Sequence, residues 1–268
     1  MIEDITSKYD VDDWVASNTN LDRAIKAEIR SAYEELWYQG SQSDCIFGDS
    51  TKKLIAMEDA ARLSATLPKT QLFSKKRGTN ASMSGFDLMA FLWGDRQKLA
   101  SCGKDNALLV IGDEGDISSC GEEDVIYYTG NRASIASSGA YTNISVKGHG
   151  ANVSTTGGWN DIRVTGDNAK ISISGYISTA DVVGDKAHII NTNGHCRTFY
   201  KGAGGIITLS GDSGQFKASE GTLVSAYVYD HNKEPIDIIT GRIGENGLKP
   251  DTLYTVLDGK FAEIGAST

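Results

Sequence analysis

The sequence predicts an α+β protein in which a nonapeptide β-solenoid lies between a helical N-terminal domain and a C-terminal β cap. Three observations support this prediction. Glycine recurs every nine residues through the middle of the chain, an aliphatic residue follows each glycine at a fixed distance, and the flanking segments lack this pattern. Long internal repeats indicate stacked structural units. The predicted domains are residues 1–93, 94–194 and 195–268.

The N-terminal segment shows helical rather than repeat patterning. Residues 20–38 place apolar side chains on one helical face, and Gly40 ends the run. Ser50 or Thr51 caps a second predicted helix that reaches about residue 64. Ser84 caps a third, whose nearly all-round apolar pattern predicts a plug for the open end of the solenoid.

The repeat itself predicts coils of eighteen residues. The glycines are Gly94, Gly103, Gly112, Gly121, Gly130, Gly139, Gly148, Gly157, Gly166, Gly175 and Gly184. The fifth residue after each is a large aliphatic in ten of eleven cases, and the seventh alternates between small polar and larger apolar residues as far as Val164. Alternation of nines gives a true period of eighteen. Each coil therefore consists of two half-coils of nine, each a short strand and a turn in which glycine tolerates positive φ.

The C-terminal segment loses the period of nine and predicts a small β domain. Strands are expected at residues 206–209, 223–229 and 236–239. The turn-rich residues 230–233 predict a hairpin. We expect this segment to close the second end of the solenoid.

The cysteines and overall composition favour an intracellular protein. Cys102 and Cys120 are one coil apart and should stack; a disulfide between them is geometrically conceivable but not expected in the cytosol. The acidic N-terminus lacks a signal peptide, and no apolar run could span a bilayer. A net charge of −9 argues against direct nucleic-acid binding. The predicted location is the cytoplasm of a bacterial host.

No residue pattern in the chain indicates catalysis or metal binding. Gly-x-Ser-x-Gly and His-Glu-x-x-His are absent, and the cysteines lack zinc spacing. The repeat lacks the regular aspartates of calcium-binding nonapeptides, and its period is not the six of hexapeptide acyltransferases. We therefore predict no enzyme, no catalytic residue, no metal and no cofactor. An active site between the helical domain and the solenoid is the least favoured alternative.

The chain also resembles a group of phage and prophage hypothetical proteins. The resemblance covers residues from about 94 to 263. It is carried by the Gly-x-x-Ala-x-Ile-x-Ser-Ser nonapeptide at residues 130–138, the segment Ile-Gly-Glu-Asn-Gly-Leu-Lys-Pro at 243–250, and the Tyr-x-Val-x-x-Gly-Lys ending at 254–260. It implies a phage or mobile-element origin but no activity.

The first candidate binding surface, the acidic edge, comes from a cluster of carboxylates. Residues 101–130 hold seven acidic residues and one lysine. Such a strip could meet a basic groove in a nucleic-acid-handling protein, or it could simply be a solvated edge that discourages aggregation. Its predicted contact residues are Asp113, Glu114, Asp116, Glu122, Glu123 and Asp124.

The second candidate surface is the aromatic strip, which consists of Tyr141, Trp159 and Tyr176. Tyr141 and Trp159 are eighteen residues apart, so they should lie side by side on one edge. Exposed aromatic residues are typical of partner or sugar contacts. Packing against the N-terminal helices is an equally good interpretation.

Two functions follow from these surfaces. The first is a non-enzymatic, phage-derived binding protein that inhibits a bacterial protein through the acidic edge, plausibly a nucleic-acid-handling defence complex (anti-CRISPR or anti-restriction). The alternative is a structural or glycan-binding virion module that uses the aromatic strip. The predicted partner is a bacterial host protein or defence complex, with no nucleic acid or membrane, and a homo-oligomer is left open.

Overall fold

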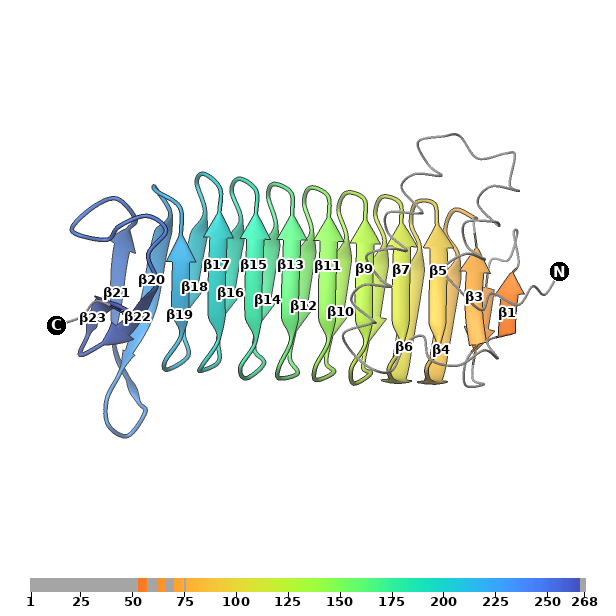
Figure 1. The fold of residues 1–268 in the computed structure, drawn as a ribbon, viewed down its shortest axis with the longest axis horizontal. Coiled ribbons are helices and arrows are strands. Elements are labelled where there is room, and N and C mark those ends of the chain that lie inside the picture. The colour runs from red at the N-terminus through yellow and green to blue at the C-terminus, as the bar shows by residue number, and fades with distance from the viewer. Residues whose placement is uncertain (1–52, 57–61, 66–69, 75, 266–268) are drawn as a thin grey trace. The chain divides into compact units, whose positions relative to one another are not determined.

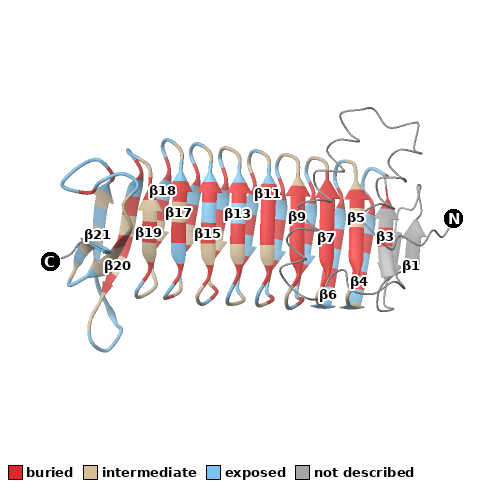
Figure 2. Cartoon of the chain, in the orientation of Figure 1, coloured by how far each residue is buried: buried red, intermediate tan, exposed pale blue. Residues whose placement is uncertain are grey.

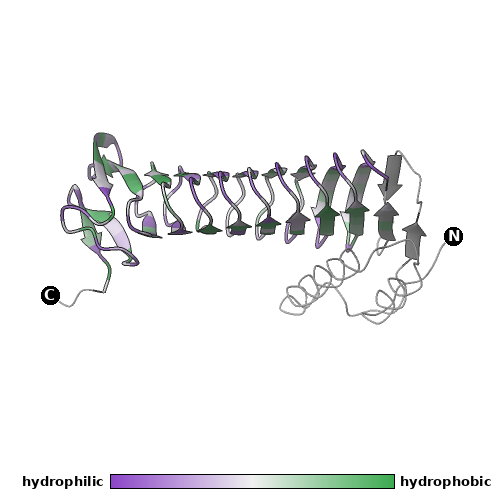
Figure 3. Ribbon diagram, turned by 90° about the horizontal axis from the view of Figure 1, so that it is seen from above, coloured by the Kyte–Doolittle hydropathy of each residue, from purple (hydrophilic) through white to green (hydrophobic). Residues whose placement is uncertain are grey.

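The structure is a computed structural model that describes residues 53–56, 62–65, 70–74 and 76–265. The chain forms two compact units, residues 1–129 and residues 130–268. The described residues form β-solenoid coils in both units (Figure 1). Each coil contributes one strand to each of two parallel sheets, and a turned view shows the sheets as two layers (Figure 3).

The first unit contains nine described strands in two parallel sheets. One sheet has the order β1-β3-β5-β7-β9 and the other β2-β4-β6-β8. The strands are β1 (Lys53–Ala56), β2 (Arg62–Ala65), β3 (Thr70–Ser74), β4 (Asn80–Phe86), β5 (Met89–Trp93), β6 (Lys98–Lys104), β7 (Ala107–Ile111), β8 (Asp116–Ser119) and β9 (Val125–Thr129).

The second unit continues the same pattern and then changes direction. Its sheets have the orders β11-β13-β15-β17-β19-β22-β23 and β10-β12-β14-β16-β18-β20-β21. The parallel strands are β10 (Ser134–Ser137), β11 (Asn143–Lys147), β12 (Asn152–Thr155), β13 (Asp161–Thr165), β14 (Lys170–Ile173), β15 (Thr179–Val183), β16 (His188–Asn191), β17 (Arg197–Lys201), β18 (Ile206–Leu209), β19 (Gln215–Ala218) and β20 (Leu223–Tyr229). The antiparallel strands are β21 (Pro235–Arg242), β22 (Tyr254–Leu257) and β23 (Lys260–Glu263).

The predicted period of eighteen is the register of the sheets. Ile144 pairs with Ile162, and Ile135 pairs with Val153. Strands bury alternate residues, so these aliphatics form inward columns (Figure 2). The seventh-position alternation also has a structural cause: one sheet turns Val146 and Val164 inward, and the other turns Ser137 and Thr155 inward.

The repeat glycines allow successive turns to approach closely. Gly148 has φ of 148°, and a Cβ atom there would overlap the carbonyl oxygen of Gly130 in the coil before it. A backbone hydrogen bond joins the same turns, with Gly130 N donating to Lys147 O at 2.8 Å. A side chain at this position would therefore break the coil spacing.

The predicted helical N-terminal domain, and with it the α+β class, is wrong. The described residues contain no helix. The helix expected at residues 50–64 gives β1 and β2, and the one expected from Ser84 gives the end of β4 and β5. Its all-round apolar pattern instead belongs to strands such as β5 and β7, in which residues on both faces are largely buried. The helix predicted at residues 20–38 lies outside the described residues.

The coils also extend past the limits drawn from the glycine repeat. Parallel pairing with a shift of eighteen already joins β3 to β5 and still joins β17 to β19. Asn193 replaces glycine at one step of the repeat, but Gly202 and Gly211 return to the spacing of nine, and the inward columns continue through Ile207 and Phe216. The hairpin expected at residues 230–233 is confirmed as the turn between β20 and β21. The antiparallel strands cover the open edges that the parallel stack leaves.

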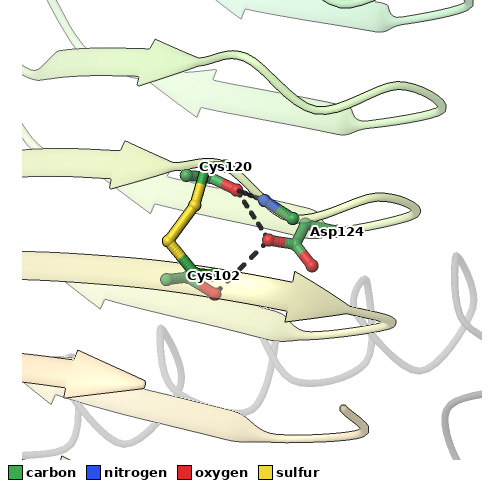
Figure 4. Close-up of a disulfide and its surroundings, with 6 residues drawn as sticks. Cys102, Cys120 and Asp124 are labelled. Carbon is green, nitrogen blue, oxygen red and sulfur yellow. Dashed lines mark hydrogen bonds between the residues drawn. A yellow bond between two sulfur atoms is a disulfide. The ribbon is translucent and has the colours of Figure 1, made fainter. Parts of the chain in front are cut away.

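A disulfide joins Cys102 and Cys120, so the expectation of two stacked free thiols is wrong. The two cysteines follow one another in adjacent coils, with a Cα–Cα distance of 4.8 Å (Figure 4). Ser84 pairs with Cys102 in the strand before, so this outward column accepts small side chains. Disulfides persist in oxidising compartments, so the cysteines no longer support a cytoplasmic location. The location stays a prediction.

We expect the double variant Cys102→Ser and Cys120→Ser to fold but to lose stability. Serine already occupies the equivalent position 84. A covalent link across eighteen residues restricts the unfolded chain, and its loss should lower the free energy of unfolding by about 3 kcal/mol. Urea denaturation measures this loss. A reducing agent should destabilise the wild type but not the double variant. Equal stability of the oxidised wild type and the variant would contradict a stabilising role for the disulfide.

Candidate functional site

The two predicted surfaces lie on the turns of the coils. Each coil has one turn leading from the β7-type sheet to the β8-type sheet, and a second turn leading back at the opposite end of the strands (Figure 1). We call them the forward turn and the return turn. Their positions are fixed by backbone hydrogen bonds between neighbouring coils, such as Arg132 N to His149 O at 2.7 Å and Trp159 N to Tyr176 O at 2.8 Å.

The six residues of the acidic edge do not form one continuous strip. Asp113 and Glu114 lie on the forward turn after β7, and Asp116 begins β8. Glu122 and Glu123 lie on the return turn before β9, at the other end of the strands. The prediction of a single acidic edge is therefore wrong in its geometry. Acidic residues that are close in the sequence lie on two turns at opposite ends of the strands.

Basic residues neutralise part of this charge. Arg96 Nε lies 2.8 Å from Glu114 Oε2, and Lys104 Nζ lies 2.8 Å from Glu123 Oε1. The Lys104 hydrogen bond lowers the pKa of Glu123. Burial and the Glu123 charge beside it raise the pKa of Asp105. The carboxylates thus belong to local ion-pair and hydrogen-bond networks, which reduces the field they project toward a partner.

Asp124 is buried and therefore cannot contact a partner on the surface. Its Oδ2 accepts hydrogen bonds from Ser119 Oγ at 2.6 Å and Ser101 Oγ at 3.3 Å (Figure 4). Its Oδ1 accepts one from Asn106 N at 3.0 Å. Ser101 and Ser119 directly precede the two disulfide cysteines. The hydrogen bonds of Asp124 therefore connect, on the inside of the solenoid, the same two coils that the disulfide connects on the outside.

The position of Asp124 belongs to an internal ladder of polar side chains. Asn106 Oδ1 accepts from Leu88 N at 3.0 Å, and Asn160 Oδ1 accepts from Thr142 N at 2.8 Å. Each step satisfies a backbone N–H that the turn leaves without a sheet partner. Asp124 is the acidic member of this ladder, and its role is structural.

The aromatic strip lies entirely on return turns of the second unit. Tyr141 and Trp159 are stacked, with ring centroids 5.9 Å apart and planes 12° apart. Tyr176 lies edge-on to His195, with centroids 5.3 Å apart. The three strip residues are about half exposed, at 53%, 51% and 46%. The second interpretation of these residues, packing against the helices predicted near the N-terminus, concerns residues 1–52, which lie outside the described residues.

The backbone at these positions is unfavourable for large side chains. Tyr141, Trp159 and Ile177 occupy the same place in successive coils and have φ values of 58°, 62° and 52°. The left-handed region costs a non-glycine residue about 1–2 kcal/mol, and least for Asn or Asp. Two aromatic residues and a β-branched residue therefore occupy positions where Gly or Asn would be more stable.

The sequence analysis missed His195 and Ser213, which continue this column beyond Ile177. Both have the same left-handed backbone, with φ of 59°. Steps of eighteen from Tyr141 lead directly to them. The interruption of the glycine repeat at Asn193 hid this continuation, since it was taken as the end of the coils.

The described residues contain no group of three or more His, Cys, Asp and Glu side chains placed to hold a metal ion. They also contain no helix suited to crossing a bilayer. Comparison with known protein families, curated proteins and solved structures found no match to this chain. The phage resemblance and the functions built on it thus stay hypotheses that rest on the sequence motifs alone.

Burial raises the pKa of Asp124 above its ordinary value of 3.8, although its hydrogen bonds oppose the shift. As pH rises, the unfolded chain loses this proton first, so the free energy of unfolding falls between the unfolded and folded pKa values and stays lower above them. We expect Asp124→Asn to remove this fall, because asparagine does not titrate. The fold should be preserved, since asparagine already fills the equivalent position in two other coils.

Urea midpoints at about pH 3 and about pH 7 measure this effect. The midpoint of Asp124→Asn minus that of the wild type should increase with pH. Asp116→Asn, which removes an exposed carboxylate from the same coil, is the matched control and should not show this increase. A difference that is constant or decreases with pH would show that the buried carboxyl does not destabilise the ionised protein.

Proposed function

We propose that this protein is a non-enzymatic binding protein that docks a protein partner on its aromatic strip. The stacked, half-exposed pair of Tyr141 and Trp159 is the observation that carries the proposal. Trp and Tyr are enriched among the residues that dominate the binding energy of protein interfaces.

The ring geometry favours a protein over a glycan. Sugars bind aromatic residues by laying a C–H face on an open ring face. Tyr141 and Trp159 turn one face toward each other, so their exposed parts include ring edges, the phenol O–H and the indole N–H. Neither polar group has a hydrogen-bond partner among the described residues. A protein surface offers both apolar contacts and hydrogen bonds to such edges.

The scaffold makes the strip suitable for tight binding. Tyr141 N donates to Gly158 O at 2.9 Å and Trp159 N donates to Tyr176 O at 2.8 Å, so neighbouring turns hold one another in place. The stacked rings also restrict each other's rotation. Binding residues that are already ordered lose less conformational entropy when a partner binds.

The class of partner comes from the sequence motifs. The phage resemblance supports a bacterial host protein, and in this proposal it is a nucleic-acid-handling defence complex that the protein inhibits. In this proposal the aromatic strip replaces the acidic edge as the principal contact, because the acidic residues are divided between two turns and partly ion-paired. A cytoplasmic site of action in the bacterial host belongs to the same proposal.

The strip is tested by Tyr141→Asn and Trp159→Asn, because asparagine tolerates the left-handed turn and should preserve the fold. The assay is affinity capture from bacterial lysate, followed by reconstitution with the purified captured protein. Loss of a dominant interface residue costs about 2 kcal/mol, so each variant should weaken the reconstituted complex about thirtyfold.

Two control variants locate the contact. Phe86→Ser removes an equally exposed aromatic residue from the first unit and should leave binding unchanged. Glu114→Lys with Glu122→Lys reverses charge on the two acidic turns and should also have little effect. Loss of binding only after charge reversal would assign the contact to the acidic residues. Binding to a glycan array that requires Trp159, with no protein captured, would favour the virion module.

A further inference from the structure

The second unit contains a cavity at the C-terminal end of the return-turn column. Its volume is about 580 Å³, within the range of ligand pockets. Ile177, His195 and Ser213 contribute the return-turn wall, and Val256 and Leu257 of β22 contribute the opposite wall. The cavity therefore lies on the same column of positions as Tyr141 and Trp159.

The antiparallel strand β22 creates this cavity. Only two of its residues pair with β19: Tyr254 with Phe216 and Thr255 with Gln215. Thr255 Oγ1 also donates to Gly214 O at 3.0 Å. Val256 and Leu257 then run past the start of β19 without pairing to it, and they line the cavity together with Ile177 and Thr179 of a preceding coil.

The charge of the cavity is opposite to that of the chain. Arg197 and His195 line it, and no Asp or Glu is among its lining residues, although the whole protein carries a net charge of −9. The nearby Asp212 carboxylate is 3.1 Å from Lys233 Nζ, which offsets its charge. An anion inside the cavity would therefore meet a cation and little repulsion.

Arg197 differs from several other described arginines in having no acidic partner among the described residues. Arg96, Arg163 and Arg242 lie within 3.4 Å of a carboxylate oxygen. Within the described part of the chain, no carboxylate is within ion-pair distance of Arg197. Its Nε donates to Gln215 Oε1 at 3.2 Å, which orients the guanidinium at the cavity wall. A guanidinium held in this way is suited to a carboxylate.

We propose that this cavity receives an acidic side chain of the protein partner that docks on the aromatic strip. The inference rests on the proposed function and identifies the chemistry of that partner. His195 lies two coils from Trp159, or about 10 Å at the usual strand spacing. A standard interface covers about 800 Å² on each protein, which is large enough to include both Trp159 and the cavity mouth.

The remaining lining residues fit glutamate. The hydroxyls of Thr179 and Ser213 can donate to the second carboxylate oxygen, and Gln215 fixes the arginine. Ile177 and Leu257 provide apolar surface for the methylene groups of the side chain. A phosphate group is fully hydrophilic and would leave that apolar surface without a contact.

The first arm of the test uses small probes on the full-length protein. N-acetylglutamate and N-acetylglutamine differ in charge but not in shape. NMR titration of the arginine Nε–H signals should show millimolar binding of the acid and at least tenfold weaker binding of the amide. Arg197→Gln should weaken the binding of N-acetylglutamate at least tenfold. Arg163→Gln changes an exposed arginine outside the cavity and should not weaken this binding.

Three results of this arm would overturn the inference. They are equal binding of acid and amide, unchanged binding of the acid in Arg197→Gln, and tighter Arg197-dependent binding of inorganic phosphate than of N-acetylglutamate. As a control for folding, Arg197→Gln should unfold at the same temperature as the wild type, which would show that a loss of binding is not a loss of fold.

The second arm uses the reconstituted partner complex and separates this inference from the proposed function. Arg197→Gln should weaken the complex at least tenfold, and replacing one glutamate of the partner by glutamine should have the same effect without adding to it. A complex that depends on Trp159 but not on Arg197 would overturn the inference and leave the proposed function standing. A complex that depends on neither residue would overturn both.

Discussion

The structure depends on one constraint, which is that the chain returns to the same position after eighteen residues. Parallel backbone hydrogen bonds fix this spacing, and each inward side chain is buried by the equivalent residues before and after it. The repeat glycines permit the close approach of turns, as at Gly148 over Gly130. Every surface feature of the coils, including the aromatic strip and the cavity, follows from residues stacked at this interval.

The sequence was sufficient to predict the coils because particular residue types recur at the eighteen-residue interval. Glycines at the turns and aliphatics at the inward positions gave the period, the strands and the neighbours of Tyr141 and Cys102. The N-terminal limit failed because β5 has buried residues on both faces, which removes the alternation that distinguishes a strand from an apolar helix. The C-terminal limit failed because Asn193 interrupts the glycine repeat, although Gly202 and Gly211 return to the spacing of nine.

The candidate site was predictable only in part, for a related reason. Stacking at eighteen residues places Tyr141 beside Trp159, as the register confirms. Burial and the side of the coil depend on where each turn begins, which a count along the chain did not resolve for Asp124 or for Glu114 and Glu122. The cavity depends on the direction of β22, a long-range pairing that no local pattern indicates. Arg197 did not stand out in the sequence, because its lack of an acidic partner depends on which residues surround it in the fold.

The parallel register also has an evolutionary consequence. Insertion or removal of one coil adds or deletes eighteen residues, and it leaves every remaining side chain facing its original direction. Such a change in the second unit between Trp159 and β17 would move the cavity relative to the strip by one strand spacing, about 4.8 Å. The distance between the two features can therefore vary only in discrete steps, and a shift of one coil would displace one contact of a rigid partner while leaving the other intact.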